Sequence, residues 1–582
     1  MAKSTLIALS LGLLLPLTSL ANSNEWVKTS DRYTQAILEI RGKYDPEIAS
    51  FDGLESYDTQ TVDWGPNYRQ RHAKSFRQIL AKLEQAKKTE RDPRVHQDLV
   101  ILTRGIERDL TGRQLQQSLL LPYYNAAESI YHGLETLLQE QNTAERKQRA
   151  IERLKRYIGM LPGSQPLTEQ AKARTLEALR QPGLIGPYQE ELVQGIDNTP
   201  RYLDGIAELF KTAKLTGWEP AHATLSKQLH DYDQWLKQHL QPRARSQATL
   251  PAAIYLHRLQ VNGVDLQPAE LIERSAASFL EIRDEMQALA DQIAIERKLP
   301  SKDYREVLRI LLAETLPADQ VLPHYQQRLK TIEAIIRRER ILSLPEREAI
   351  IRLATEAEAA ATPSAQMKAP RLVGNTGERG EFLIPLRNPN AQTGADTSDD
   401  LNPSASWTLT AHEARPGHEL QFARMIETGV SLARALFAED TANVEGWALY
   451  SEALIRPYMP LEGQLLSLKD RMLRIARGFL DPMVNTGQIT PQEAKAFLMK
   501  EVLISEAFAQ QEADRYAFRD PGQATSYYHG YLKLRALRHQ TEFKLGTRFD
   551  QQAFHDFILA QGLLPPDQLT EAVKRAFIPR YQ

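Results

Sequence analysis

Residues 410–421 read Thr-Ala-His-Glu-Ala-Arg-Pro-Gly-His-Glu-Leu-Gln, and the rest of the chain is organised around this stretch. It holds two of only 13 histidines in 582 residues, His412 and His418, with Glu413 beside the first. On an uninterrupted helix, side chains six positions apart differ by about 120° in direction, so the two imidazoles would diverge. The proline and glycine between them predict a bend that brings the rings together. The alternative is a helix end with two surface histidines.

The spacing differs by two residues from H-E-x-x-H, the motif of many zinc peptidases. In that motif both histidines face one side of a helix and the glutamate activates water. If a bend absorbs the two extra residues, Glu413 stays next to one metal ligand and keeps the place of a general base. The motif therefore predicts a reshaped metal site.

Residues 441–452 supply carboxylates for such a site. The segment begins 23 positions after His418, which leaves room for a turn and a returning helix. Glu445 and Glu452 are seven apart and share a helix face. One carboxylate opposite two histidines completes a tetrahedral zinc site whose fourth position is water. We expect Glu445 to be the third ligand, with Glu452 and Asp440 orienting the imidazoles; a charged pair on a solvated face is the alternative.

A later segment, residues 512–531, carries groups that suit an oxyanion. Hydrolysis of an amide builds negative charge on the carbonyl oxygen, and a phenol, imidazole or guanidinium aimed at it stabilises the transition state. Tyr527 and His529 are the candidates, and Glu512 and Arg515 are candidates for supporting or substrate contacts. Tyrosines packing a helix start after a Pro-Gly turn would give the same spacing.

Composition limits the partners and the ligands. Charged residues make up 25% and hydrophobic ones 42%, which is typical of a globular protein. The formal net charge of −2 does not favour nucleic acid as a partner. Because the chain has no cysteine, disulfides, thiolate ligands and a lipid-modified cysteine are excluded, and a metal must be held by His, Asp or Glu.

The N-terminus has the features of a secretory signal peptide. Lys3 precedes an apolar run from Leu6 to Leu20, and Ser-Leu-Ala ends the segment at Ala21. We expect cleavage near Ala21, export to the periplasm or the medium, and no membrane insertion afterwards. A retained anchor is the alternative, but the run is short and is interrupted by Ser, Gly and Pro.

Hydrophobic periodicity predicts a mainly α fold with a small β element. From residue 25 to 344, apolar residues recur at helical spacing. Residues 349–354 and 381–386 read as short strands, the second restricted by its proline to an edge or an end. Residues 388–406 read as loop, and helix resumes to residue 582. The predicted division is 1–21 signal peptide, 22–345 helical region and 346–582 catalytic region, the last two forming one continuous unit.

The three motifs together resemble a bacterial family known as domain of unknown function 885. The matching patterns are H-E-x-x-P-G-H-x-x-Q, E-G-W-A-x-Y-x-E and E-x-x-R-Y followed by P-G-Q-A-x-x-Y-x-x-G. That family is grouped with zinc metallopeptidases of the H-E-x-x-H, gluzincin-like type. The resemblance implies one Zn²⁺ at His412, His418 and Glu445, with Glu413 as base. This chain has Arg415 where many relatives carry an aromatic residue. Arg415 could attract a substrate carboxylate, or it could be an exposed helix charge.

These observations favour an exported zinc-dependent hydrolase that cleaves peptide bonds. Two alternatives stay open at this point. One is a metal hydrolase acting on peptidoglycan fragments or on another amide or ester. The other is a metal-binding scaffold without activity, although the presence of a base at Glu413 speaks against it.

Overall fold

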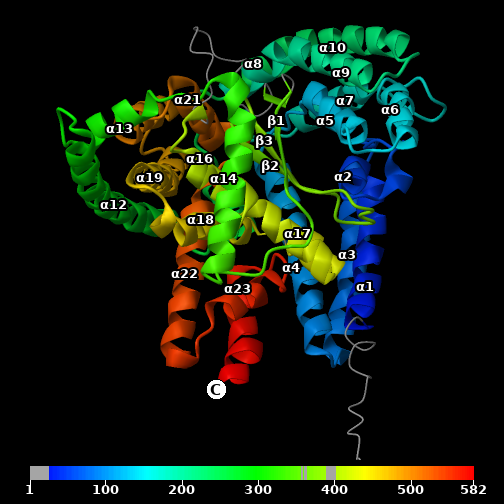
Figure 1. Ribbon diagram of the computed structural model, residues 1–582. Helices are drawn as coiled ribbons and strands as arrows, with labels where there is room; N and C mark the ends of the chain where they lie inside the picture. The colour runs from blue at the N-terminus through cyan, green and yellow to red at the C-terminus, as the bar shows by residue number, and fades with distance from the viewer. Residues whose placement is uncertain (1–24, 356–357, 360–363, 388–400, 439) are drawn as a thin grey trace, which may run out of the picture.

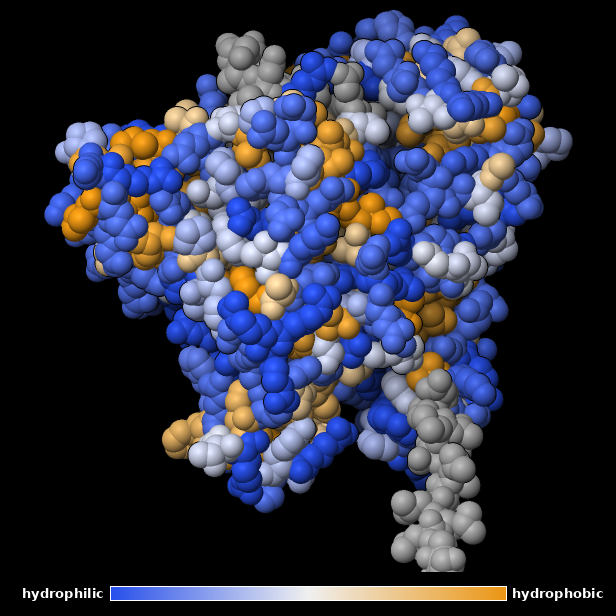
Figure 2. Space-filling model, in the orientation of Figure 1, coloured by the Kyte–Doolittle hydropathy of each residue, from blue (hydrophilic) through white to orange (hydrophobic). Residues whose placement is uncertain are grey.

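The computed structural model describes residues 25–355, 358–359, 364–387, 401–438 and 440–582, and it is mainly α-helical, as predicted. The predicted signal peptide and most of the predicted loop 388–406 lie outside these residues. None of the helices in the described part is long and apolar enough to span a membrane. The face shown in Figure 2 is mainly hydrophilic, with small apolar patches.

Two groups of helices form the N-terminal part. The first group packs side by side at one edge of the molecule, and the second lies above it with a hydrophobic core of its own (Figure 1). The first comprises α1 (Glu25–Tyr44), α2 (Pro46–Phe51), η1 (Glu55–Tyr57), α3 (Tyr68–Thr89) and α4 (Pro93–Leu119). The second comprises α5 (Ala126–Leu138), α6 (Ala144–Tyr157), α7 (Leu167–Leu179), α8 (Gln189–Asp197), α9 (Thr199–Thr212) and α10 (Glu219–His239).

Further helices lead from these groups to a small sheet. They are η2 (Gln241–Arg243), α11 (Ala252–Val261), α12 (Pro268–Arg297), α13 (Tyr304–Leu312) and α14 (Ala318–Arg338). α12 begins at Pro268, where a proline in the first turn loses no helical hydrogen bond.

The sheet has three strands in the order β1-β3-β2, and β3 is central. β1 (Ile350–Leu353) runs parallel to β3 (Glu381–Ile384), and β2 (Gln366–Lys368) runs antiparallel to it. The two predicted strands are present, and the second ends just before its proline. β2 was not predicted, because its three residues are too few for a strand pattern and none of them is β-branched.

The C-terminal part surrounds one buried helix, α19 (Leu461–Asn485), which is covered on nearly every side. The hydrophobic core around α19 also includes residues of α12, α13 and α14, which precede residue 345. The predicted boundary between the helical and catalytic regions at residue 345 stays a prediction. The elements around it are α16 (Ser406–Leu409), η4 (Thr410–Ala414), α17 (His418–Thr428), η5 (Ala433–Phe437), α18 (Thr441–Ile455), η6 (Arg456–Tyr458), α20 (Pro491–Phe497), η7 (Leu498–Val502), α21 (Glu506–Asp514), η8 (Arg515–Arg519), η9 (Gln523–Thr525), α22 (Ser526–Leu545), η10 (Gly546–Arg548), α23 (Gln551–Leu559), α24 (Pro566–Ala572), η11 (Val573–Phe577) and α25 (Ile578–Tyr581).

Two glycines allow α18 and α22 to approach at backbone distance. A Cβ added at Gly446 would lie 2.5 Å from the carbonyl carbon of Gly530, and one added at Gly530 would lie 1.8 Å from the carbonyl oxygen of Ala442. Real Cβ atoms do not tolerate such distances to backbone. The contact therefore fixes Glu445, one residue before Gly446, relative to Tyr527 on α22.

A buried ion pair joins α19 to α21. The Arg477 guanidinium donates to both oxygens of Glu512 at 2.7 and 2.8 Å, and Tyr516 donates to the same carboxylate at 2.9 Å. Burial alone would raise the pKa of Glu512, but Arg477 and Arg515 outweigh it and lower the pKa to about 2. The carboxylate thus stays ionised within the core.

We expect Gly530→Ala to lower the melting temperature, because the new methyl group meets backbone that cannot move aside. Overpacking of this kind costs about 1–3 kcal/mol. Gly105→Ala is the matched control, since this glycine also lies inside a helix but only the carbonyl oxygen of Phe437, 4.0 Å away, would be near its Cβ. It should be neutral or slightly stabilising. Equal melting temperatures for both variants would contradict the proposed close contact.

We expect Glu512→Gln to destabilise the protein at neutral pH and to matter less in acid. A carboxyl whose pKa is lowered on folding stabilises the folded state above its unfolded pKa of 4.5, and that contribution is lost as the pH falls toward about 2. A shift of this size corresponds to about 3 kcal/mol. Melting temperatures of wild type and variant, measured from pH 7 down to pH 3, should converge. A gap that is constant over this range would contradict the ionised pair.

Candidate metal centre

The predicted break between the two histidines is present, and it divides the motif into two helical segments. His412 lies in η4, a π-helical turn that ends at Arg415, and His418 is the first residue of α17. The backbone of Gly417 passes so close to η4 that a Cβ there would lie 1.8 Å from the carbonyl oxygen of His412. Only glycine fits this position, because the chain folds back on itself.

The fold brings His412, His418 and Glu445 together, and their possible ligand atoms all lie within 4.8 Å of one another. Oε2 of Glu445 is 3.6 Å from Nε2 of His412 and 3.4 Å from Nε2 of His418. Around a tetrahedral zinc ion with bonds of about 2.0–2.1 Å, ligand atoms lie about 3.4 Å apart. The spacing of these three side chains therefore fits one small cation.

The polar atoms of this cluster also favour a positive charge between them. Oε2 of Glu445 is buried and has no hydrogen-bond partner, which is costly for a carboxylate oxygen. Burial lowers the pKa of His412, but the carboxylates of Glu445 and Glu452 outweigh it and raise the pKa to about 10. The carboxylates thus favour positive charge beside this ring, and a metal cation would provide it in place of a proton.

Glu452 contacts the first histidine. Its Oε1 lies 2.7 Å from Nδ1 of His412 inside the core, with both side chains almost fully buried. A carboxylate on Nδ1 leaves Nε2 for a metal and fixes the direction of the ring. Arg474 of α19 lies 3.9 Å behind the same carboxylate oxygen and balances its charge.

Glu413 lies beside this cluster and is held by the sheet. Its Oε1 is 3.9 Å from Nε2 of His412, and its Oε2 accepts a hydrogen bond of 2.7 Å from the backbone N–H of Met367. Met367 belongs to β2, so one strand residue restrains the side chain that the sequence singles out as the base. Nothing in the residues around Met367 would have revealed this contact.

Tyr527 lies between guanidinium groups near Glu445. Nη2 of Arg515 donates to its hydroxyl at 3.0 Å, and the guanidinium of Arg477 lies 4.6 Å from its ring centroid. Burial raises the pKa of Tyr527, as does Glu445, although Arg515 opposes both. The phenol therefore stays protonated near neutral pH. Because Arg515 already donates to the phenol oxygen, the proton of Tyr527 is left to be donated elsewhere.

His529, a candidate for stabilising an oxyanion, faces Asp265 in the structure. Its Nε2 lies 3.0 Å from Oδ1 of Asp265, in the turn after α11. Positions 527 and 529 differ by about 200° around α22, so the two side chains leave the helix on opposite sides. Burial lowers the pKa of His529 to about 4, although Asp265 opposes this shift. The ring is therefore neutral near neutral pH.

Asp440 and Arg415 are also placed differently from the expectation. Asp440 is the N-cap of α18, and its Oδ1 accepts from the backbone N–H groups of Ala442 and Asn443 rather than from an imidazole. Arg415 is only 2% exposed.

The guanidinium of Arg415 is occupied by neighbours within the fold. It donates to Glu419 at 2.7 Å, to Glu333 of α14 at 2.6 Å and to the carbonyl oxygen of Arg347. Arg415 is therefore neither an exposed charge nor an open cation for a substrate carboxylate. It ties the turn between the histidines to α14.

The sequence interpretation overlooked the charged face of α19. Asp470, Arg474 and Arg477 are spaced three or four residues apart in a helix that is otherwise mainly apolar. Arg474 lies near Glu452 and Asp470, and Arg477 pairs with Glu512, all behind the centre. Charged residues at helical spacing within an apolar helix could have indicated buried partners.

Comparison with known structures supports the fold. A "putative lipoprotein" from Colwellia psychrerythraea superposes with a TM-score of 0.76 and 17% identity, over 95% of this chain and 99% of that one. A "putative lipoprotein of unknown function" from Shewanella oneidensis gives 0.71 and 16%, over 94% and 100%. A "putative oligoendopeptidase F" from Bacillus anthracis str. Ames, at 0.28 and 10% over 95% and 90%, is too dissimilar to carry an argument.

Among curated proteins, none matches this chain. The family described as "Bacterial protein of unknown function (DUF885)" matches residues 46–573, which include every element of the centre. This match covers most of the chain. The chain therefore belongs to the DUF885 family of bacterial proteins.

Proposed function

We propose that this protein is an exported zinc-dependent hydrolase that cleaves peptide bonds. The observation that carries the proposal is the convergence of His412, His418 and Glu445 with Glu413 beside them. A bound zinc ion would supply a Lewis acid that polarises a carbonyl group and acidifies water. Two neutral imidazoles and one carboxylate are a ligand set that zinc prefers. The signal-like N-terminus supports export.

Glu413 is the proposed general base. Its Oε2 is held by the N–H of Met367, and its Oε1 remains available on the side of His412. In this role Oε1 takes a proton from the attacking water and passes it to the leaving amine. A protein that only binds a metal has no need for such a group.

Tyr527 is the proposed donor to the oxyanion. Its hydroxyl oxygen accepts from Arg515, so its own hydrogen can be donated to a carbonyl oxygen that gains charge in the transition state. Glu512 contributes indirectly, because it holds both Arg477 and Arg515 at this place. Nothing in the placement of His529 supports a direct part, since it faces Asp265.

We expect Glu413→Gln to abolish hydrolysis without loss of zinc. Glutamine can still accept the N–H of Met367 through its amide oxygen, so the fold around it is preserved while the base is removed. The rate of peptide cleavage should fall by about 10²- to 10⁴-fold. Zinc content by atomic absorption and digestion of a peptide library give the two readouts.

Glu427→Gln is the matched control for that variant. Glu427 lies on α17 and accepts hydrogen bonds from the backbone N–H groups of Glu346 and Arg347, but it is not one of the residues proposed for the metal site or the mechanism. It should keep full activity. Zinc bound by wild type without cleavage of any peptide would contradict a peptidase, and turnover of peptidoglycan fragments or esters instead would assign one of those substrates. Zinc bound equally tightly by His418→Ala would contradict the ligand set.

We expect Tyr527→Phe to lower kcat by about 10²-fold with little change in KM or zinc affinity, since a hydrogen bond made in the transition state is lost. Tyr528→Phe is the control, because Tyr528 is the next residue on α22 and its ring stacks on Tyr531. Steady-state kinetics of both variants on one peptide give the comparison. Equal kcat values for Tyr527→Phe and wild type would remove Tyr527 from the mechanism.

A further inference from the structure

A buried tryptophan holds the turn that separates the two histidines. Nε1 of Trp447 donates to the carbonyl oxygen of Pro416 at 2.9 Å, and the side chain is 1% exposed. Trp447 lies on α18, two residues after Glu445. The hydrogen bond therefore joins the helix that carries one proposed ligand to the turn that directs the other two.

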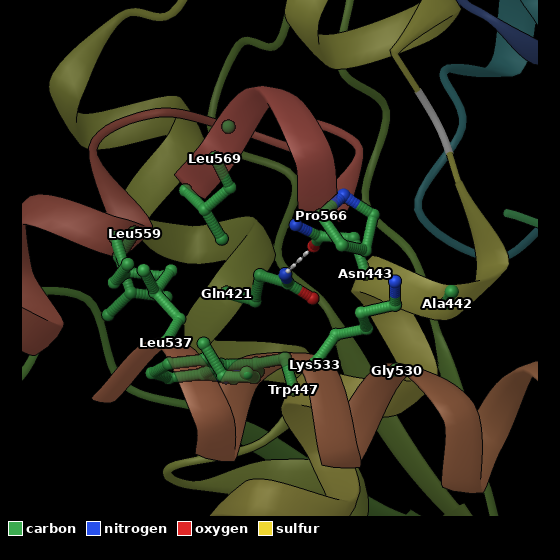
Figure 3. Close-up of a pocket in the computed structure, with 13 residues that line it drawn as sticks. Gln421, Ala442, Asn443, Trp447, Gly530, Lys533, Leu537, Leu559, Pro566 and Leu569 are labelled. Atoms are coloured by element: carbon green, nitrogen blue, oxygen red, sulfur yellow. Dashed lines mark hydrogen bonds between the residues drawn. The ribbon is translucent and has the colours of Figure 1, made fainter. Parts of the chain in front are cut away.

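A second buried hydrogen bond joins the same two parts of the fold. Nε2 of Gln421 donates to Oδ1 of Asn443 at 2.9 Å, and Nδ2 of Asn443 donates to the carbonyl oxygen of Leu564 at 2.7 Å. Gln421 lies three residues after His418, and Asn443 lies two residues before Glu445. Figure 3 shows the first of these bonds between the two helices.

The two hydrogen bonds bracket the ligands on both helices. On α18 their residues flank Glu445, two positions away on either side. Around the start of α17, Pro416 and Gln421 flank His418. A pair of bonds on both sides of a contact fixes both the separation and the rotation of the two segments, whereas one bond would leave a pivot.

A small cavity lies beside these two hydrogen bonds. A cavity of about 20 Å³ adjoins Gln421, Asn443 and Trp447, and a space of that size holds about one water molecule. Oε1 of Gln421 is buried without a partner, and Figure 3 shows it directed away from Asn443, on the side of Lys533. The hydrogen bonds therefore add to packing in holding the helices in register beside this space.

We propose that Trp447 and Gln421 are positioning residues of the metal centre, which set the distance between His418 and Glu445. The inference rests on the proposed metal site and deepens it. These side chains touch neither metal nor substrate. They act through the backbone, and their loss changes how well the ligand set matches a cation rather than which residues form it.

The test compares Trp447→Phe and Gln421→Met with wild type in titrations with Zn²⁺ and with Co²⁺ alone. Each variant keeps the bulk of the side chain and removes the donor. We expect the affinity for Zn²⁺ to fall about tenfold in each, which lies at the lower end of the effect of residues behind metal ligands. The visible absorption of bound Co²⁺, which reports coordination geometry, should change in both.

Trp218→Phe is the matched control. Nε1 of Trp218 donates to the carbonyl oxygen of Leu215 at 3.0 Å, and the side chain is 6% exposed, so it loses the same kind of bond far from the centre. Melting temperatures without metal show the loss of stability in each variant. Zn²⁺ affinity and the Co²⁺ spectrum of Trp218→Phe should match wild type.

The outcomes separate this inference from the proposed function. Wild-type affinity and spectra in both positioning variants would overturn the inference alone. An equal loss of affinity in Trp218→Phe would also overturn it, since general destabilisation would then account for the effect. Wild type that binds no Zn²⁺ would overturn the metal site and the inference together. Because two independent variants are used, failure of one to fold leaves the other decisive.

Discussion

The backbone contact between Gly417 and the carbonyl group of His412 is the constraint on which the centre depends. It forces the chain to turn back within six residues, so that the end of one helical segment faces the start of the next. Without that turn, the angular offset of a regular helix would point the imidazoles apart. The two residues by which the motif exceeds H-E-x-x-H form the turn itself and leave the ligand pair intact.

Charge is arranged in layers around this turn. The carboxylates of Glu445 and Glu452 lie near the two ring nitrogens of His412, and Arg474 stands behind Glu452. Ionised groups are stable inside a protein only when partners compensate the lost hydration. The basic residues of α19 provide that compensation on one side of the centre. On the other side, Oε2 of Glu445 lies near both imidazoles without a hydrogen-bond partner, and a cation would fit there.

The sequence predicts the helical class, both longer strands and the residues that converge, because these depend on local periodicity and on rare residue types. Glu445 could be paired with the histidines since its helix had to return over a short connection. The partners of His529 and Arg415 could not be predicted in the same way, because Asp265 and Glu333 come near them only through tertiary packing. Asp440 differs, since it caps the first turn of its own helix, a local contact that an aspartate before a helix could have indicated. The contact of Glu413 with a backbone N–H in β2 leaves no trace in residue type at all.

The tether between Glu413 and Met367 divides the centre between two supports. The ligands stand on α17, α18 and η4, which the glycine contact of α18 with α22 joins to Tyr527. The proposed base, Glu413, also lies on η4, but its side chain is restrained by a three-residue strand at the edge of a separate sheet. A shift of that strand would turn the carboxylate of Glu413 without moving the histidines. In the proposed mechanism, affinity for a metal and competence for proton transfer would thus respond to different parts of the fold.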